Sequence, residues 1–116
     1  MADEEDWSKD LPWLGQYILD ENGKPVRARG LLEWGRWLQE HDAERQLALD
    51  QIGAARVSTI FLGLDSFSIF QRDQPHEPVL WETMVFGGPY NLFQQRYTSK
   101  EEALKGHGRI VQMLTS

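Results

Sequence analysis

Two stretches of strand-forming residues, at 57–64 and 79–86, limit most strongly how this chain can fold. Each is about as long as a typical strand, is rich in β-branched and aromatic residues, and is bounded by Gly, Pro or Asp. The linker between them is long enough for the two strands to pair antiparallel. Both alternating faces of each stretch are largely apolar. We therefore expect two central strands of a sheet that is covered at least partly on both sides.

The region before these strands carries signals for a hairpin and a helix. Asn22 and Gly23 favour a tight turn in which both central residues have positive φ, so we expect a short hairpin over residues 16–28. Residues 30–41 repeat their large apolar side chains with helical spacing, which predicts an amphipathic helix. The face that would pack inward contains Leu31, Trp34 and Leu38.

Two further strands are expected, one on each side of the central pair. Residues 45–52 alternate as a strand does, although their residue types favour a helix. We favour the strand because Gly53 and Ala54 would then form a tight turn into the strand that begins at residue 57. Residues 94–98 also alternate and predict a short strand after the loop at 87–93.

The C-terminal segment is predicted to be a helix that begins at Ser99. Ser99 and Glu102 have the spacing of a capping box, in which each side chain bonds a free backbone N–H of the first turn. An apolar stripe follows on one face and consists of Ala103, His107, Ile110, Val111 and Leu114. Glycine destabilises a helix interior, so either Gly106 or Gly108 is expected to permit a close backbone approach, and Gly106 lies nearer the stripe.

Together these elements predict an α+β domain. We expect an antiparallel sheet of about four strands with two helices packed on it, plus a short N-terminal hairpin. Residues 1–14 are interpreted as an acidic, flexible tail and residues 15–116 as a single domain. Five acidic residues and one lysine at positions 1–10 account for four of the six net negative charges. The body is therefore nearly neutral, which argues against general nucleic-acid binding.

The chain has no cysteine and no apolar run long enough to span a bilayer. We therefore expect no disulfide, no Cys-based metal site and no membrane association. The acidic N-terminus is unlike a signal peptide. These features predict a cytoplasmic protein.

Several segments in this order resemble a family of small uncharacterised proteins encoded by bacteriophages and prophages. The most specific of them are the run from Val57 to Asp65 and the triplet Glu82-Thr83-Met84. The remaining ones are Tyr17-Ile18-Leu19-Asp20, Asn22-Gly23-Lys24-Pro25-Val26, Leu31-Leu32-Glu33-Trp34-Gly35-Arg36-Trp37, Arg96-Tyr97-Thr98, Glu102-Ala103 and Gly106-His107. The resemblance implies a strand at residues 45–52, a bacterial host and no particular activity. Family members often have a histidine after the Leu-Asp pair, whereas this chain has Ser66, which puts His-dependent chemistry there in doubt.

Only one set of polar residues resembles a catalytic or metal site. Asp65 and Glu82 lie on neighbouring predicted strands, where His76 and His107 could approach them. Structural roles are the favoured interpretation: Asp65 as a turn former, Glu82 as the partner of an arginine, and His107 as a buried side chain bonded to backbone or to Glu82. We expect no catalytic residue, no metal and no cofactor. A small hydrolase or nucleotide-binding protein that uses Asp65, Glu82 and His107 is the alternative.

Aromatic residues in predicted loops and at a helix border favour a binding protein. They are Trp37, Phe67, Phe70, Tyr90 and Phe93. A domain of this size has too small a core to bury every aromatic residue with ease, and aromatic side chains anchor protein interfaces. We predict a non-enzymatic, phage-type accessory protein that binds a host or phage protein or a second copy of itself, for example to inhibit a host factor or defence complex. A structural component of a phage particle is a further alternative, and closure of the aromatic loops over the ends of the sheet is the competing structural explanation.

Overall fold

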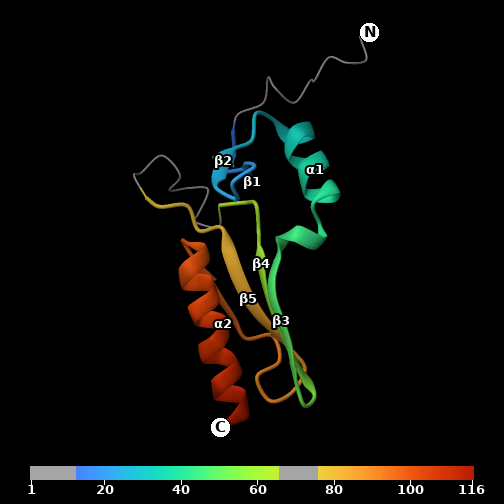
Figure 1. The fold of residues 1–116 in the computed structure, drawn as a ribbon, viewed down its shortest axis with the longest axis vertical. Helices are drawn as coiled ribbons and strands as arrows, with labels where there is room; N and C mark the ends of the chain where they lie inside the picture. Colours follow the sequence, from blue (N-terminus) through green and yellow to red (C-terminus); the bar gives the residue numbers. More distant parts are fainter. Residues whose placement is uncertain (1–12, 66–75) are drawn as a thin grey trace.

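The computed structural model describes residues 13–65 and 76–116 and contains an α+β fold (Figure 1). Its elements, in chain order, are β1 (Tyr17–Leu19), β2 (Pro25–Arg27), α1 (Leu31–Glu40), the 3₁₀ helix η3 (Ala43–Arg45), β3 (Gln46–Ile52), β4 (Ala55–Phe61), β5 (Trp81–Phe86), β6 (Gln94–Tyr97) and α2 (Lys100–Thr115). Most of the predicted tail, together with Phe67 and Phe70, lies outside the described residues. The predicted fold class is confirmed, including the strand at 45–52.

The main sheet is an antiparallel meander in the order β3-β4-β5-β6. In β4 and β5, Thr59 pairs with Thr83 and Ile60 pairs with Glu82, so alternate residues of the two strands share a face. Strands β1 and β2 form the expected hairpin, with Gly23 at a φ of +79° in its turn. The hairpin is therefore confirmed, but the turn with two residues at positive φ is not, because Gly23 has a positive φ and Asn22 does not.

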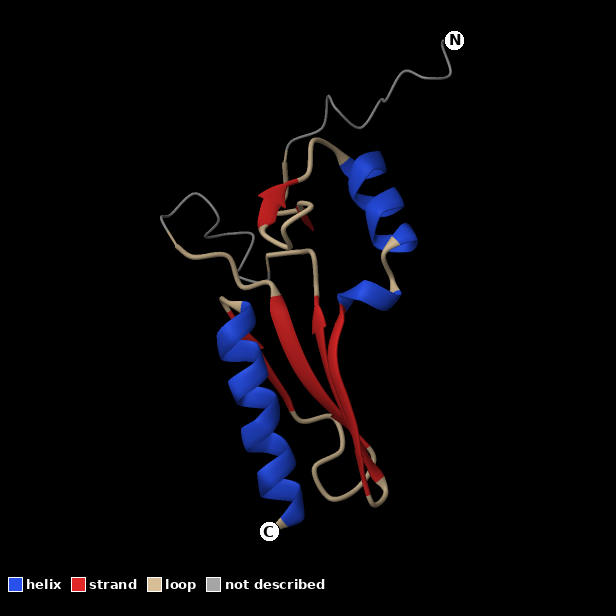
Figure 2. Ribbon diagram, viewed as in Figure 1, coloured by secondary structure: helices blue, strands red, loops and turns tan. Residues whose placement is uncertain are grey.

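Helix α2 covers one face of the sheet, as Figure 2 shows. The side chains beneath it are completely or almost completely buried and are Ala55, Val57, Thr59, Phe61, Trp81, Thr83, Val85 and Tyr97. The alternate residues of β4 and β5, including Ile60 and Met84, face the opposite side and are only partly buried. From the sequence we expected both faces of the sheet to be covered, because the residues of the second face are also largely apolar. The structure instead leaves this second face partly exposed.

Helix α1 lies beyond the end of the sheet and packs on the hairpin (Figure 1). The start of β1 and the residues just before it pair with the chain after β4, through Tyr17 N–H to Gly63 O at 2.8 Å and Asp65 N–H to Gly15 O at 2.8 Å. The Trp34 indole also donates to Gly63 O, at 2.7 Å. These bonds hold the hairpin and α1 at the sheet end, so α1 does not lie across a face as the sequence suggested.

Within the described ranges, no helix is both long enough and apolar enough to cross a membrane.

Candidate functional site

Asp65 holds together the two ends of the segment that follows β4. Its Oδ1 accepts the Val79 N–H at 2.9 Å, and its Oδ2 lies 2.6 Å from His76 Nε2. Its backbone N–H bonds Gly15 O. The carboxylate is buried and therefore acts as a local organiser of backbone, which extends the turn-forming role expected from the sequence.

Glu82 and His107 lie on opposite faces of the sheet. Glu82 is on the face away from α2, where its carboxylate accepts from Arg96 Nε at 2.9 Å across the β5–β6 pair. His107 is on α2 and is buried against the other face. The polar site suggested by Asp65, Glu82 and His107 is therefore not assembled, because neighbouring residues of a strand point to opposite sides.

His107 belongs to a buried chain of hydrogen bonds that the sequence did not predict. Its Nδ1 lies 2.7 Å from the Thr59 hydroxyl, and its Nε2 lies 2.7 Å from Asp50 Oδ2. The Thr59 and Thr83 hydroxyls are 2.5 Å apart, and Tyr97 donates to Thr83 at 3.0 Å. His107 thus bonds neither backbone nor Glu82, the two partners expected from the sequence.

One assignment of donors and acceptors satisfies every group in this series of hydrogen bonds. The Asp50 carboxylate can only accept, so His107 Nε2 carries a hydrogen and donates it. If Tyr97 donates to Thr83, Thr83 to Thr59 and Thr59 to His107 Nδ1, every hydroxyl donates once and the imidazole is neutral. The buried polar groups under α2 are then all paired, which removes the cost of placing them in the core.

The order of carboxylate, imidazole and hydroxyl also occurs in hydrolase triads, but here the hydroxyl is inaccessible. Thr59 has no exposed surface at all, and neither has Thr83 beside it. A substrate has no route to the hydroxyl oxygen. The arrangement therefore fastens α2 to the sheet.

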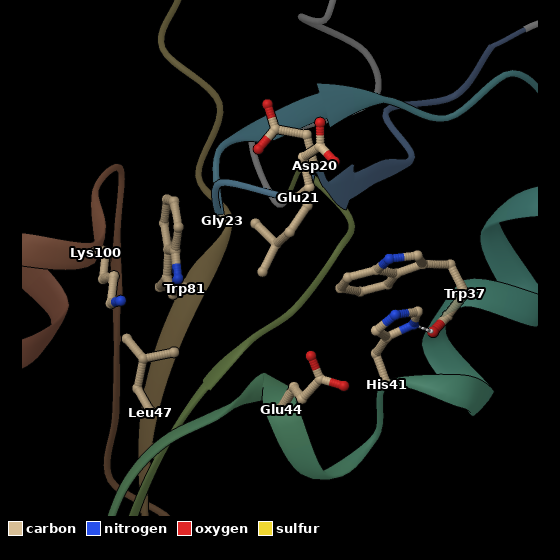
Figure 3. A pocket seen from close by; sticks show the side chains of 10 residues that line it. Asp20, Glu21, Gly23, Trp37, His41, Glu44, Leu47, Trp81 and Lys100 are labelled. Carbon is tan, nitrogen blue, oxygen red and sulfur yellow. Dashed lines mark hydrogen bonds between the residues drawn. The ribbon is translucent and has the colours of Figure 1, made fainter.

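A cavity of about 530 Å³ lies between the hairpin turn, the end of α1 and the start of the sheet (Figure 3). Its lining consists of Leu19, Asp20, Glu21, Gly23, Trp37, His41, Glu44, Leu47, Trp81 and Lys100. Trp37, which the sequence suggested as a binding residue, is partly buried. Its ring stacks on His41 at 4.5 Å between centroids and meets the Phe61 ring edge-on at 5.9 Å.

The loop between β5 and β6 exposes three neighbouring large apolar side chains. Tyr90 is 44% exposed, Leu92 62% and Phe93 41%. The sequence suggested Tyr90 and Phe93 as binding residues and missed Leu92. We call Tyr90, Leu92 and Phe93 the apolar loop.

Leu92 has a left-handed backbone, with a φ of +71°. Its N–H bonds Val85 O at 2.7 Å, and Val85 N–H bonds Phe93 O at 2.9 Å. Two residues thus oppose one, which is a β-bulge of the kind that usually has glycine at the left-handed position. Among the described residues, Leu92 is the only one other than glycine with a positive φ.

No family model, curated protein or solved structure matches this chain.

Proposed function

We propose that this protein acts by binding another protein through the apolar loop, without catalysing a reaction. The observation that carries the proposal is Leu92, a leucine in a conformation that favours glycine, with most of its side chain in solvent. A left-handed conformation costs a residue with a Cβ roughly 1 kcal/mol. Strained residues concentrate at functional sites, and the Leu92 side chain, 62% exposed, contributes little burial that would offset this cost.

The surface around the apolar loop supports the same function. A second cavity, of about 260 Å³, lies between the loop and the end of α2, and Pro89, Tyr90, Met113 and Leu114 are among its lining residues. Met113 is itself 38% exposed. Apolar surface thus continues from the loop to the helix end, which offers a partner both a protruding anchor and a recess.

The polar residues give little support to the alternative function. A hydrolase or nucleotide-binding protein would need Asp65, Glu82 and His107 near one another, and each instead bonds partners of its own. The resemblance to phage-encoded proteins favours a host factor, a defence complex or a phage protein as the partner. A role in the phage particle would use the same surface, with a phage protein as the partner.

Site-specific photocross-linking tests the proposal. We would place p-benzoylphenylalanine at position 92 and, as a matched control, at position 104, because Leu104 is also exposed, at 44%, but lies on α2. In the bacterial host, irradiation should give one discrete adduct from position 92 and none from position 104. Absence of an adduct at 92, or the same adducts from both positions, would overturn the proposal.

A further inference from the structure

The cavity between the hairpin and α1 has a wall that can stack on a flat group. Trp37 projects from α1 with His41 stacked beneath it, and Trp81 forms the opposite wall (Figure 3). The Glu44 side chain enters from η3 and directs its carboxylate towards the space between these walls. The lining thus combines an aromatic surface with a carboxylate.

Two groups of this cavity that have no hydrogen-bond partner among the described residues, on the side formed by α1 and η3, are acceptors. His41 Nδ1 lies 2.9 Å from Trp37 O, and since a carbonyl can only accept, Nδ1 carries the hydrogen. In the neutral ring, Nε2 is then an acceptor. No described residue hydrogen-bonds His41 Nε2 or the Glu44 carboxylate. A ligand that fits these two groups must bring hydrogen-bond donors.

The charge of the lining is predominantly negative. Asp20, Glu21 and Glu44 are opposed only by Lys100. Asp20 Oδ1 already accepts the N–H groups of Asn22 and Lys24 in the hairpin turn. Of the three carboxylates, that of Glu44 is the one directed into the space between the aromatic walls (Figure 3). The cavity therefore favours a cation.

We propose that this cavity binds a guanidinium group. A guanidinium is planar, stacks on tryptophan, carries five N–H donors and has no acceptor, so it matches the shape, the acceptor set and the charge of the lining. A metal ion is a poorer match, because the described residues include no group of three or more His, Cys, Asp or Glu side chains that could hold one.

This inference does not depend on the proposed function. The cavity includes Trp81 at the start of β5, whereas the apolar loop follows the end of that strand. Substitutions at the apolar loop therefore leave the cavity intact, and either proposal can fail alone.

A titration followed by two-dimensional NMR tests the site with Nα-acetyl-L-arginine amide as the probe. The Trp37 indole N–H signal, assigned with a Trp37→Phe variant, should shift saturably with a dissociation constant on the order of 1 mM, as expected for one small group. Nα-acetyl-L-citrulline amide has nearly the same shape without the charge and should bind at least about tenfold more weakly. Equal effects of the two compounds, or no shift with either, would overturn the proposal.

Removing single charges from the lining tests the proposal further, because loss of an acidic and of a basic side chain should change the affinity in opposite directions. Glu44→Gln should weaken arginine amide binding about threefold, while Glu40→Gln, an exposed change on α1 outside the cavity, should leave it unchanged. Lys100→Gln should strengthen binding about twofold, and Lys105→Gln should not. Weaker binding of the arginine amide to Lys100→Gln would contradict the guanidinium assignment.

The source of the guanidinium is decided by a second probe. Binding of methylguanidinium as tight as that of the arginine amide indicates a site for the free group. Tighter binding of the amide indicates an arginine side chain presented by a polypeptide. Both results require guanidinium binding, and failure of both probes rejects it.

Discussion

Polar residues are buried and fully hydrogen-bonded on one face of the main sheet and partly exposed on the other. Under α2, Thr59 and Thr83 are fully buried and are satisfied by each other, by Tyr97 and by His107. On the open face, Glu82 pairs with a half-exposed Arg96. Glu82 and Arg96 directly precede Thr83 and Tyr97 on β5 and β6. The difference teaches that polar side chains buried under α2 need protein partners, whereas those on the open face can also use solvent.

The largest effect is expected at Gly106, where α2 approaches the sheet most closely. A Cβ at this position would lie 2.2 Å from the Tyr97 hydroxyl oxygen, and the buried tyrosine bonded to Thr83 has little room to move. Gly106→Ala should lower the free energy of unfolding by about 3 kcal/mol, measured by urea denaturation.

Gly108→Ala is the matched control for this substitution. Nothing lies within 4 Å of the added Cβ at Gly108, and alanine has the higher helix propensity. The free energy of unfolding should therefore rise by about 0.5–1 kcal/mol. Equal effects at the two glycines would contradict the close packing of α2.

The next largest effect concerns the buried hydrogen-bond chain. Thr59→Val keeps the shape of the side chain but leaves His107 Nδ1 and the Thr83 hydroxyl without the Thr59 oxygen. The free energy of unfolding should fall by about 2 kcal/mol. Ser58→Ala, which removes a hydroxyl bonded to Gln46 on the open face, should cost at most about 0.5 kcal/mol. A larger loss from Ser58 than from Thr59 would reverse the contrast between the faces.

The smallest effect is expected from the ion pair on the open face. Single variants Glu82→Gln and Arg96→Gln and the double variant form a cycle whose coupling energy should be about 0.5 kcal/mol, because Arg96 is exposed to solvent. Thermal or urea unfolding of the four proteins measures it. A coupling energy larger than the loss measured for Thr59→Val would contradict the contrast between the two faces.

The sequence predicted those features that depend on local pattern. The serine half of the predicted capping box is present, with Glu102 N–H donating to the Ser99 hydroxyl at 3.1 Å. The N-terminal hairpin and the close approach at Gly106 were also foreseen, although Asn22 in the hairpin turn does not have the positive φ that was expected. Each depends on a few adjacent residues whose conformational preferences are strong.

Features that depend on strand register and tertiary placement were missed. His107 meets Thr59 and Asp50, which lie 48 and 57 residues away along the chain, and no spacing rule links such residues. The position of α1 follows from hydrogen bonds between Gly15, Tyr17 and the chain after β4. The cavity beside Trp37 depends on that position, and hence could not be anticipated.

The sequence did not single out Leu92, because what distinguishes this residue is its backbone conformation. A leucine among Tyr90, Asn91 and Phe93 reads as one more apolar loop residue, and only the φ of +71° distinguishes it. No composition or periodicity signal predicts a left-handed leucine.

The most direct test of the proposed binding function is a paired measurement on the Leu92→Gly variant. Glycine relieves the left-handed conformation, so the free energy of unfolding should stay the same or rise by up to about 1 kcal/mol, while the partner that cross-links to position 92 should no longer co-purify. A variant that is equally stable and retains that partner would contradict the account, because Leu92 would then carry strain without serving an interface.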